Sequence, residues 1–404
     1  MQAVGIIAEY NPFHNGHLHH LRQSMELTGA DVSVAVISGN FTQRGSFAIL
    51  DKWTRAEMAV RNGVNLVVEM PTLFACGNAG YFARAGVEIL ENLGAAYISF
   101  GSESGNIQEL KRIAGEMRDH RNEINEAVRA AVKTGQAYPK ARAEALQRIL
   151  GEDIGGIIES PNNLLALEYL RFIKNAEPVT IRRQGTGYYD PEPKGTMASA
   201  TGIRKILAEG GDISRLVPDI TREMLLAHRG EILSEEDLYL LLIQKILTSS
   251  AEELNRIFGA EEGLGNKMKA NVRFWKSYEE IAEGLKSKRY TRTRIGRVLA
   301  MTLLGVRRED MKQARNYIRV LAFDETGSRY LREVKKSEGC RLPILTNINR
   351  EEKFSREIQN MLAKDILAGD LYNFACGRDL YACSDYVKKP FHPETGRSWE
   401  EERL

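Results

Sequence analysis

The stretch AVGIIAEYNPFHNGHLHHL, residues 3–21, decides the fold. Residues 4–8 are an apolar run typical of a buried strand, and a proline-containing loop leads from them into an amphipathic helix. A loop between strand and helix collects backbone N–H groups and the positive end of the helix dipole at one point. The stretch therefore predicts an anion site, suited to a phosphate, at the helix start.

Two histidines lie at this predicted helix start. His14 and His17 share one helical face, so both imidazoles are expected to point at the same ligand. Gly16 between them lets a bulky group lie against the backbone. From the residues alone, the pair is either a grip for nucleotide phosphates or a pair of capping or solvated histidines. His19 and His20 are interpreted as surface or packing residues.

Length and composition are those of a globular protein with room for two or three domains. The chain has 404 residues, of which 43% are hydrophobic and 27% are charged, as in ordinary globular proteins. It has no apolar run of about 18 residues and no secretory signal pattern, so we expect a cytoplasmic protein without a membrane partner. The four cysteines are scattered, and no metal site is expected from them.

Strand and helix patterns alternate through the first half of the chain. This order predicts a Rossmann-like, doubly wound parallel α/β sheet with its ligand at the carboxyl ends of the strands. The strands expected after the first one are residues 32–37, 65–70, 96–100 and 179–183. A loop over 184–196, rich in Gly, Pro and Tyr, is expected to be mobile and functional.

The strand rhythm stops after about residue 210, where helical patterns take over. One of these patterns covers 307–323, and a short strand is expected at 342–346. We therefore predict a catalytic domain at 1–208 and a mostly α-helical domain at 209–404.

A second anion cradle is expected at residues 199–204, Ser-Ala-Thr-Gly-Ile-Arg, where hydroxyls and a fixed cation meet at a helix start. The same residues also fit an ordinary N-cap followed by a surface arginine. Lys52 and Arg55, at the start of another predicted helix, either add positive charge to a phosphate site or belong to a solvated helix face.

Positive charge is concentrated in one segment. Residues 265–319 hold 15 basic and 5 acidic side chains, although the whole chain has a net charge of only +2. Such clusters contact nucleic-acid phosphates without reading bases, but basic surface helices without this role are also common. Tyr290 and Trp275 are candidates to stack on an unpaired base. The expected RNA-binding cations are Lys286, Lys288, Arg289, Arg292, Arg294 and Arg297.

The motifs resemble those of a known family. His14-Asn15-Gly16-His17 after a first strand is similar to the HxGH signature of the nucleotidyltransferase superfamily, and residues 199–204 are similar to its second, ISSTxIR-like signature. In that signature Ala200 stands where relatives often have serine, so one hydroxyl contact is lost. The longer sequence around the first motif, residues 5–21 followed by SGNFTQRG at 38–45, resembles that of the bacterial tRNA(Met) cytidine acetate ligases.

The resemblance implies a two-step reaction. Acetate attacks the α-phosphate of ATP and pyrophosphate leaves, after which the acetyl group passes to the wobble cytidine of elongator tRNA(Met) as N4-acetylcytidine. Mg²⁺ is expected with the triphosphate, held mainly by phosphate oxygens and water. No obligate protein partner is expected.

The placement of the residues and the resemblance together give the candidate site residues. The catalytic candidates are His14, His17, Lys52 and Arg204. The nucleotide-contacting candidates are Ile7, Ala8, Glu9, Tyr10, Asn11, Pro12, Phe13, Asn15, Gly16, His20, Gly101, Asn162, Arg182, Arg183, Ser199 and Thr201. Because successive strand residues face opposite ways, only one arginine of the pair at 182–183 is expected to reach the site.

Two other interpretations stay open at this point. One is a small-molecule nucleotidyltransferase that makes a coenzyme precursor and does not depend on RNA. The other is a nucleotide-regulated RNA-binding protein without turnover.

Overall fold

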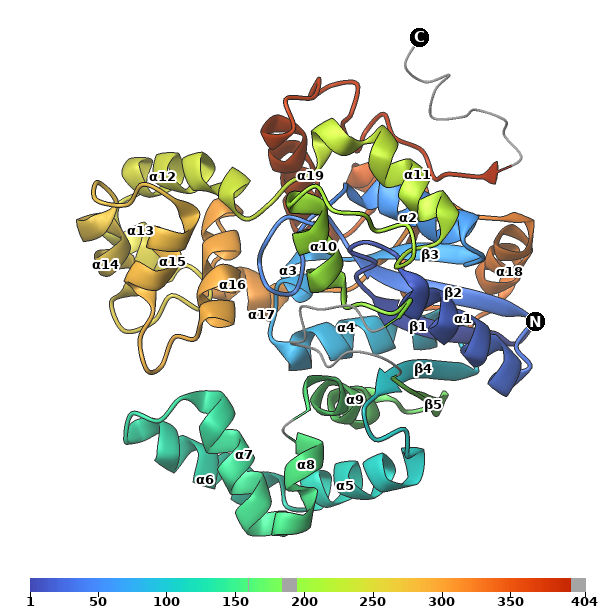
Figure 1. The fold of residues 1–404 in the computed structure, drawn as a ribbon, viewed down its shortest axis with the longest axis horizontal. Coiled ribbons are helices and arrows are strands. Elements are labelled where there is room, and N and C mark those ends of the chain that lie inside the picture. Colours follow the sequence, from blue (N-terminus) through green and yellow to red (C-terminus); the bar gives the residue numbers. More distant parts are fainter. Residues whose placement is uncertain (159, 184–194, 394–404) are drawn as a thin grey trace.

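The structure is a computed structural model, and it describes residues 1–158, 160–183 and 195–393 (Figure 1). The loop predicted over 184–196 lies outside the described residues except for its last two positions. None of the helices in the described ranges combines the length and hydrophobicity of a membrane span.

A seven-stranded sheet in the order β5-β4-β1-β2-β3-β6-β7 forms the centre of the molecule. Neighbouring strands run parallel, except that β6 is antiparallel to β3. The strands are β1 Ala3–Ala8, β2 Val32–Ser38, β3 Leu66–Met70, β4 Tyr97–Ser102, β5 Glu177–Arg182, β6 Ile318–Phe323 and β7 Ile344–Leu345. The first five strands confirm the predicted doubly wound α/β fold.

Helices cover the sheet and form a separate cluster beside it, as Figure 1 shows. The helices of the first half are α1 Asn15–Thr28, α2 Lys52–Arg61, α3 Thr72–Ala75, α4 Ala79–Asn92, α5 Ile107–Asp119, α6 Arg121–Lys133, α7 Tyr138–Leu150, α8 Gly155–Ile158, α9 Pro161–Phe172 and α10 Ala200–Ala208. The later helices are α11 Asp219–Ala227, α12 Tyr239–Thr248, α13 Ala251–Arg256, α14 Leu264–Asn271, α15 Tyr278–Leu285, α16 Arg292–Leu303, α17 Arg308–Gln313, α18 Glu325–Lys336 and α19 Arg356–Ala375.

Both faces of the sheet are buried, and β2 shows this residue by residue. Val34 and Val36 pack into a core shared with α4 and α9, whereas Ala35 and Ile37 pack into a second core shared with α1, α2 and α10. This alternation follows from the period of two along a strand, so a strand covered on both faces has apolar side chains on both.

The prediction of one helix over 307–323 is wrong for its second half. Residues 308–313 form α17, but Ile318–Phe323 is strand β6, with all but its last residue buried. The β-branched and apolar run suits a strand beside β3. The basic residues at helical spacing led instead to the prediction of a helix. The short strand expected near 342–346 is confirmed as β7. The sheet thus takes strands from both sides of residue 208, and the domain division there stays a prediction.

The cluster formed by α12–α17, which we call the helical unit, meets the loop after β2 in a close approach of backbone to backbone. A methyl group added at Gly45, whose φ is +81°, would lie 2.2 Å from the Gly296 carbonyl oxygen, and one added at Gly296 would lie 2.3 Å from Arg44 O. Only glycine permits this approach without displacement. The pair therefore fixes α16 against the loop that leads into α2.

Four buried charged groups join the start of α2 to the sheet and to the segment after α19. Lys52 Nζ lies 2.9 Å from Glu69 Oε1 in β3 and 2.6 Å from Asp385 Oδ2. Arg319 Nη1, from β6, donates to the same Asp385 oxygen at 2.8 Å. The four side chains are at most 3% exposed, so each charge depends on the others for compensation.

Removing one member of this network should destabilise the fold. Lys52→Met leaves the Glu69 and Asp385 carboxylates buried with one cation fewer, and should lower the free energy of unfolding by roughly 3–5 kcal/mol. The matched control is Lys111→Met, which breaks an exposed ion pair with Glu177 and should cost roughly 0–1 kcal/mol. Urea denaturation at neutral pH, followed by circular dichroism, measures both. Equal small losses would contradict the role given to the network.

Candidate active site

The turn from β1 into α1 is held by a buried aromatic ring. Tyr10 has a φ of +47°, which is unfavourable for a residue with a side chain. Its ring is 1% exposed and packs on Phe13 at 4.8 Å and on the His17 ring at 5.0 Å between centroids. Burial of the ring stabilises the strained backbone, and the turn brings His14 to the N-cap of α1.

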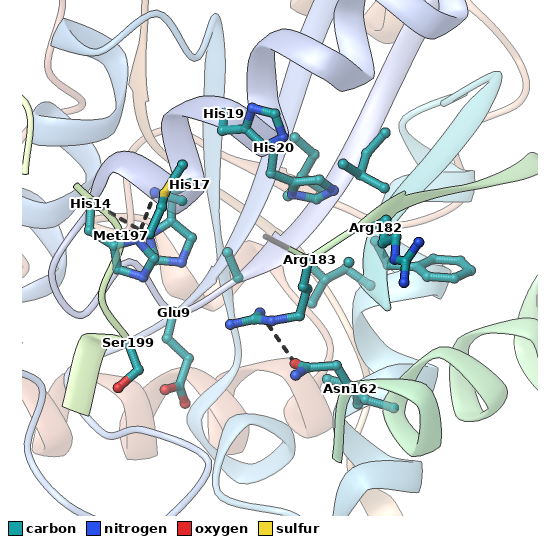
Figure 2. A pocket seen from close by; sticks show the side chains of 18 of the residues that line it. Glu9, His14, His17, His19, His20, Asn162, Arg182, Arg183, Met197 and Ser199 are labelled. Carbon is teal, nitrogen blue, oxygen red and sulfur yellow. Dashed lines mark hydrogen bonds between the residues drawn. The ribbon is translucent and has the colours of Figure 1, made fainter. Parts of the chain in front are cut away.

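The two histidines of the motif present hydrogen-bond donors to the space in front of α1. His14 Nδ1 accepts from Gly16 N–H at 3.1 Å, and His17 Nδ1 accepts from His14 N–H at 3.2 Å. Because each Nδ1 is an acceptor, the proton of each neutral imidazole is on Nε2. The rings are stacked with their centroids 3.7 Å apart (Figure 2). Two Nε2–H groups therefore lie side by side.

Burial keeps these imidazoles neutral. Desolvation, followed by the charges of Arg183 and Arg204, lowers the pKa of His14 to about 3. Desolvation and the adjacent His14 hold the pKa of His17 well below its usual value. Desolvation and Arg183 lower the pKa of His20 to about 4. An anion bound here would meet neutral donors rather than imidazolium ions.

A cavity of about 230 Å³ opens at the carboxyl ends of β1, β4 and β5. In the sheet β1 lies between β2 and β4, so the strand order reverses at this position, where doubly wound sheets bind their ligands. The cavity is lined mainly by the ends of these strands, by α1 and by α9 (Figure 2).

A larger cleft of about 890 Å³ adjoins this cavity. The two share Glu9, His14, His17, Arg183 and Ser199 as lining residues. The cleft then extends past α10 and the segment 229–235 to the first residues of α16. The histidine pair thus lies between a cavity at the strand ends and a cleft that reaches the helical unit.

Most of the predicted nucleotide-contacting residues line one of these spaces. Those in the cavity are Ile7, Ala8, Glu9, His14, Gly16, His17, His20, Gly101, Asn162, Arg182, Arg183 and Ser199. Those in the cleft include Tyr10, Asn11, Thr201 and Arg204. Pro12, Phe13, Asn15 and Lys52 line neither among the described residues. Asn15 instead donates to the carbonyl oxygens of Thr196 and Arg215 at 3.0 and 2.8 Å.

Lys52 and Arg55 have structural roles that the sequence did not indicate. Lys52 belongs to the buried ion network and lines neither space, so its expected contribution to phosphate binding is wrong as a direct contact. Arg55 is also fully buried, and its guanidinium donates to the carbonyl oxygens of Leu50, Glu9, Ser38 and Gly39. Neither side chain is on a solvated helix face.

Both arginines after β5 reach the cavity, so the expectation that only one does so is wrong. Arg182 is the last residue of β5 and Arg183 follows it, outside the alternation of the strand. Arg183 Nη1 lies 3.5 Å from Asn162 Oδ1, and its side chain crosses Gly101, where a methyl group would come within 3.3 Å of Arg183 Cγ. Gly101 therefore leaves room for this arginine.

The second motif is tied to the first. Ser199 Oγ caps α10 by accepting from Gly202 N–H at 3.1 Å. Arg204 Nη1 donates to Asn11 O at 2.7 Å, and its Nη2 donates to Thr201 Oγ1 at 3.2 Å. The start of α10 is thus joined to the loop that precedes α1.

Sequence reasoning missed several lining residues. His19, interpreted as a surface or packing residue, lines the cavity. His20 was interpreted in the same way from the residues alone but was a nucleotide-contacting candidate by the resemblance, and it also lines the cavity, with its Nε2 3.0 Å from Ser99 Oγ. Leu165 and Tyr169 lie three and seven residues after Asn162 on one face of α9, a helical spacing that was available as a signal. Gln43, in the loop after β2, had no such signal.

The basic segment is less exposed than its composition suggests. Tyr290 is 4% exposed and Trp275 packs against the core, so stacking of Tyr290 on a base is wrong. Most of the predicted RNA-binding cations have acidic partners: Lys286 with Glu283, Arg289 with Glu262, Arg292 with Glu235 and Glu279, and Arg294 with Glu261. Arg297 is half-buried, and Lys288 is exposed.

Comparison with known proteins agrees with this geometry. A family model described as HIGH Nucleotidyl Transferase matches residues 1–382. A tRNA(Met) cytidine acetate ligase of Thermoanaerobacter sp. (strain X514) is 40% identical and covers 96% of this chain and 98% of its own length. The protein of that name from Bacillus licheniformis is 38% identical, with 92% of each chain covered.

Solved structures give the same result. Thermotoga maritima TmcAL without ligand superimposes with a TM-score of 0.90 at 31% identity, over 97% of this chain and 99% of that one. The same protein bound with alpha-thio ATP gives a TM-score of 0.89. The chain described here belongs to the tRNA(Met) cytidine acetate ligase family, within the HIGH nucleotidyl transferases.

Proposed function

We propose that this chain is an ATP-dependent ligase that acetylates the wobble cytidine of elongator tRNA(Met). Acetate attacks the α-phosphate of ATP to form acetyl-adenylate, and pyrophosphate leaves. The N4 amine of cytidine then takes the acetyl group and AMP leaves. The observation that carries the proposal is the position of the His14–His17 pair between the strand-end cavity and the cleft that reaches the helical unit.

The neutral histidine donors suit the first step. Adenylyl transfer requires the triphosphate to be positioned and the charge on the departing pyrophosphate to be stabilised. The Nε2–H groups of His14 and His17, together with the N-terminus of α1, are placed for the α- and β-phosphates. Ser199, Thr201 and Arg204 at the start of α10 are placed for the distal phosphates.

The strand-end cavity suits the nucleoside part of ATP. Gly101, Asn162 and Arg183 form a connected wall at the ends of β4 and β5, and Phe100 and Tyr169 add aromatic surface. The described residues include no cluster of three or more His, Cys, Asp or Glu side chains able to hold a metal ion. We expect any Mg²⁺ that accompanies ATP to be held mainly by phosphate oxygens and water.

The cleft suits the RNA acceptor. Its lining includes the cations Arg44, Lys205, Arg229 and Arg292, and phosphates are attracted to such surfaces. Beyond the cleft, the helical unit and its surroundings expose cations without an ion partner among the described residues. They include Lys267, Arg273, Lys276, Lys288 and Lys312. We place the anticodon arm across this surface, with its wobble base in the cleft.

The proposal predicts RNA-dependent labelling. Purified protein incubated with ATP, radiolabelled acetate and elongator tRNA(Met) should release pyrophosphate and place label in N4-acetylcytidine. Without tRNA, label should appear only in acetyl-adenylate. Pyrophosphate release that needs no acetate would favour a small-molecule nucleotidyltransferase. Binding of ATP and tRNA without pyrophosphate release would favour an RNA-binding protein.

Loss of either motif histidine should separate chemistry from RNA binding. His14→Ala and His17→Ala should each slow acetate-dependent ATP–pyrophosphate exchange by roughly 10²–10³-fold, the usual cost of losing one preorganised donor. Their affinity for tRNA should change little, because the exposed cations lie on the helical unit. His120→Ala, at an exposed position between α5 and α6, is the matched control. Equal loss of exchange and tRNA affinity would contradict this division.

The donor role requires neutral histidines, and this requirement predicts a pH dependence of stability. An unfolded histidine has a pKa of about 6.5. With the pKa of His14 lowered to about 3, the unfolded chain binds a proton that the folded chain does not between these values. The free energy of unfolding should therefore fall as the pH falls below about 6.5, by about 1.4 kcal/mol per pH unit for this group, and be unaffected by it above.

Comparison with a variant isolates this contribution. His14→Asn keeps an N-cap acceptor but removes the titrating group. Urea denaturation at pH 7.5 and 5.0 should show a loss of stability that is smaller in the variant by roughly 2 kcal/mol. Identical losses in the two proteins would mean that His14 is not held neutral.

A further inference from the structure

Glu9 is the one carboxylate among the nucleotide-contacting candidates, and the contacts proposed above for the phosphates and the nucleoside do not use it. It is the first residue after β1, is half-buried, and lines both the cavity and the cleft. Among the described residues it is the one carboxylate that lines both spaces. Figure 2 shows its side chain extending into the cavity from the end of β1, beside the histidine pair. It therefore lies where the two substrates of the second step meet.

The Glu9 carboxylate is held in place by the surrounding backbone. Its Oε1 accepts from Gln43 N–H at 2.7 Å, and its own carbonyl oxygen accepts from Arg55 Nη1 at 2.6 Å. The first contact fixes the carboxylate to the loop after β2, and the second fixes the backbone from which it projects. A group held at both ends keeps its direction when substrates enter.

A fixed negative charge is unfavourable for the first step. Both ATP and acetate are anions, and a carboxylate beside them weakens their binding by like-charge repulsion. The other polar groups around the cavity attract anions, because they are arginines, N–H donors and a helix N-terminus. A carboxylate in such surroundings suits a partner that donates protons, and the amine of the incoming base is one.

The two motif histidines cannot take that proton, and His19, which lines the cavity, does not line the cleft. The Nδ1 atoms of His14 and His17 are occupied by backbone N–H groups, and their Nε2 atoms already carry hydrogen. His20 is engaged with Ser99. Glu235, the other carboxylate that lines the cleft, pairs with Arg292 at 2.6 Å and does not line the cavity. Among the residues that line both the cavity and the cleft, Glu9 is therefore the available proton acceptor.

We propose that Glu9 is the general base of acetyl transfer. The lone pair of cytidine N4 forms a bond to the acetyl carbon of acetyl-adenylate, and the bond from that carbon to the phosphate oxygen breaks with its electron pair leaving on AMP. The proton lost by N4 passes to the Glu9 carboxylate, and no further reactant is needed. This inference rests on the proposed function, because it concerns the second step of that reaction.

Separate measurement of the two steps tests the role of Glu9. Glu9→Gln keeps a carbonyl oxygen for Gln43 N–H and removes the proton acceptor. Acetate-dependent ATP–pyrophosphate exchange should be retained or increased, because a negative charge is lost beside two anions. Single-turnover transfer of acetyl from preformed acetyl-adenylate to tRNA should fall by roughly 10²–10⁴-fold, the usual contribution of a general base.

Loss of both steps together would overturn the inference, since it would indicate a role in folding or in nucleotide binding. Unchanged transfer would overturn it as well. If Glu9→Gln does not fold, Glu9→Asp keeps the charge and withdraws the carboxylate by one methylene. It should slow transfer more than exchange, and an equal loss of both would overturn the inference. The wild-type protein tests the proposed function separately, because its failure to form acetylcytidine would refute that function whatever the variants do.

Discussion

The buried guanidinium of Arg55 is the constraint on which the site depends. It donates to Glu9 O at 2.6 Å, to Ser38 O and Leu50 O at 2.9 Å each, and to Gly39 O. These carbonyls lie at the ends of β1 and β2 and just before α2, where the chain leaves the sheet in irregular conformations. Without Arg55 these carbonyl groups would be buried without hydrogen bonds, which lowers the stability of the fold. One side chain thus satisfies the backbone of two loops and sets the distance between them.

The two loops carry different parts of the site. The loop after β1 carries Glu9 and leads to the motif histidines at the start of α1, and the loop after β2 carries Gln43 and meets α16 at Gly45. Because both loops are anchored to Arg55, the nucleotide cavity and the helical unit share one reference point. This arrangement explains how a surface far along the sequence comes to line a cleft beside the histidines.

The parts of the fold that sequence predicts are those encoded by contiguous residues. The first five strands are contiguous segments of five to seven residues with apolar and β-branched side chains, and the histidine motif follows the first of them after a short loop. Pairings between residues far apart in the chain could not be predicted from the sequence, because no local pattern encodes them. Residues 209–264 hold 12 acidic and 5 basic side chains, and three of their glutamates, at 235, 261 and 262, neutralise arginines of the basic segment. Likewise, nothing local indicates that Lys52 pairs with Asp385 or that β6 joins β3.

The position of Asp385 limits the order in which the protein matures. Its carboxylate lies between Lys52 and Arg319, yet it is made long after both. Synthesis delivers the amino-terminal strands first. Until Asp385 leaves the ribosome, the two cations have Glu69 as their one remaining partner within the described network, and burying them so is unfavourable. The buried ion network of the sheet is therefore complete only when nearly the whole described chain has been translated.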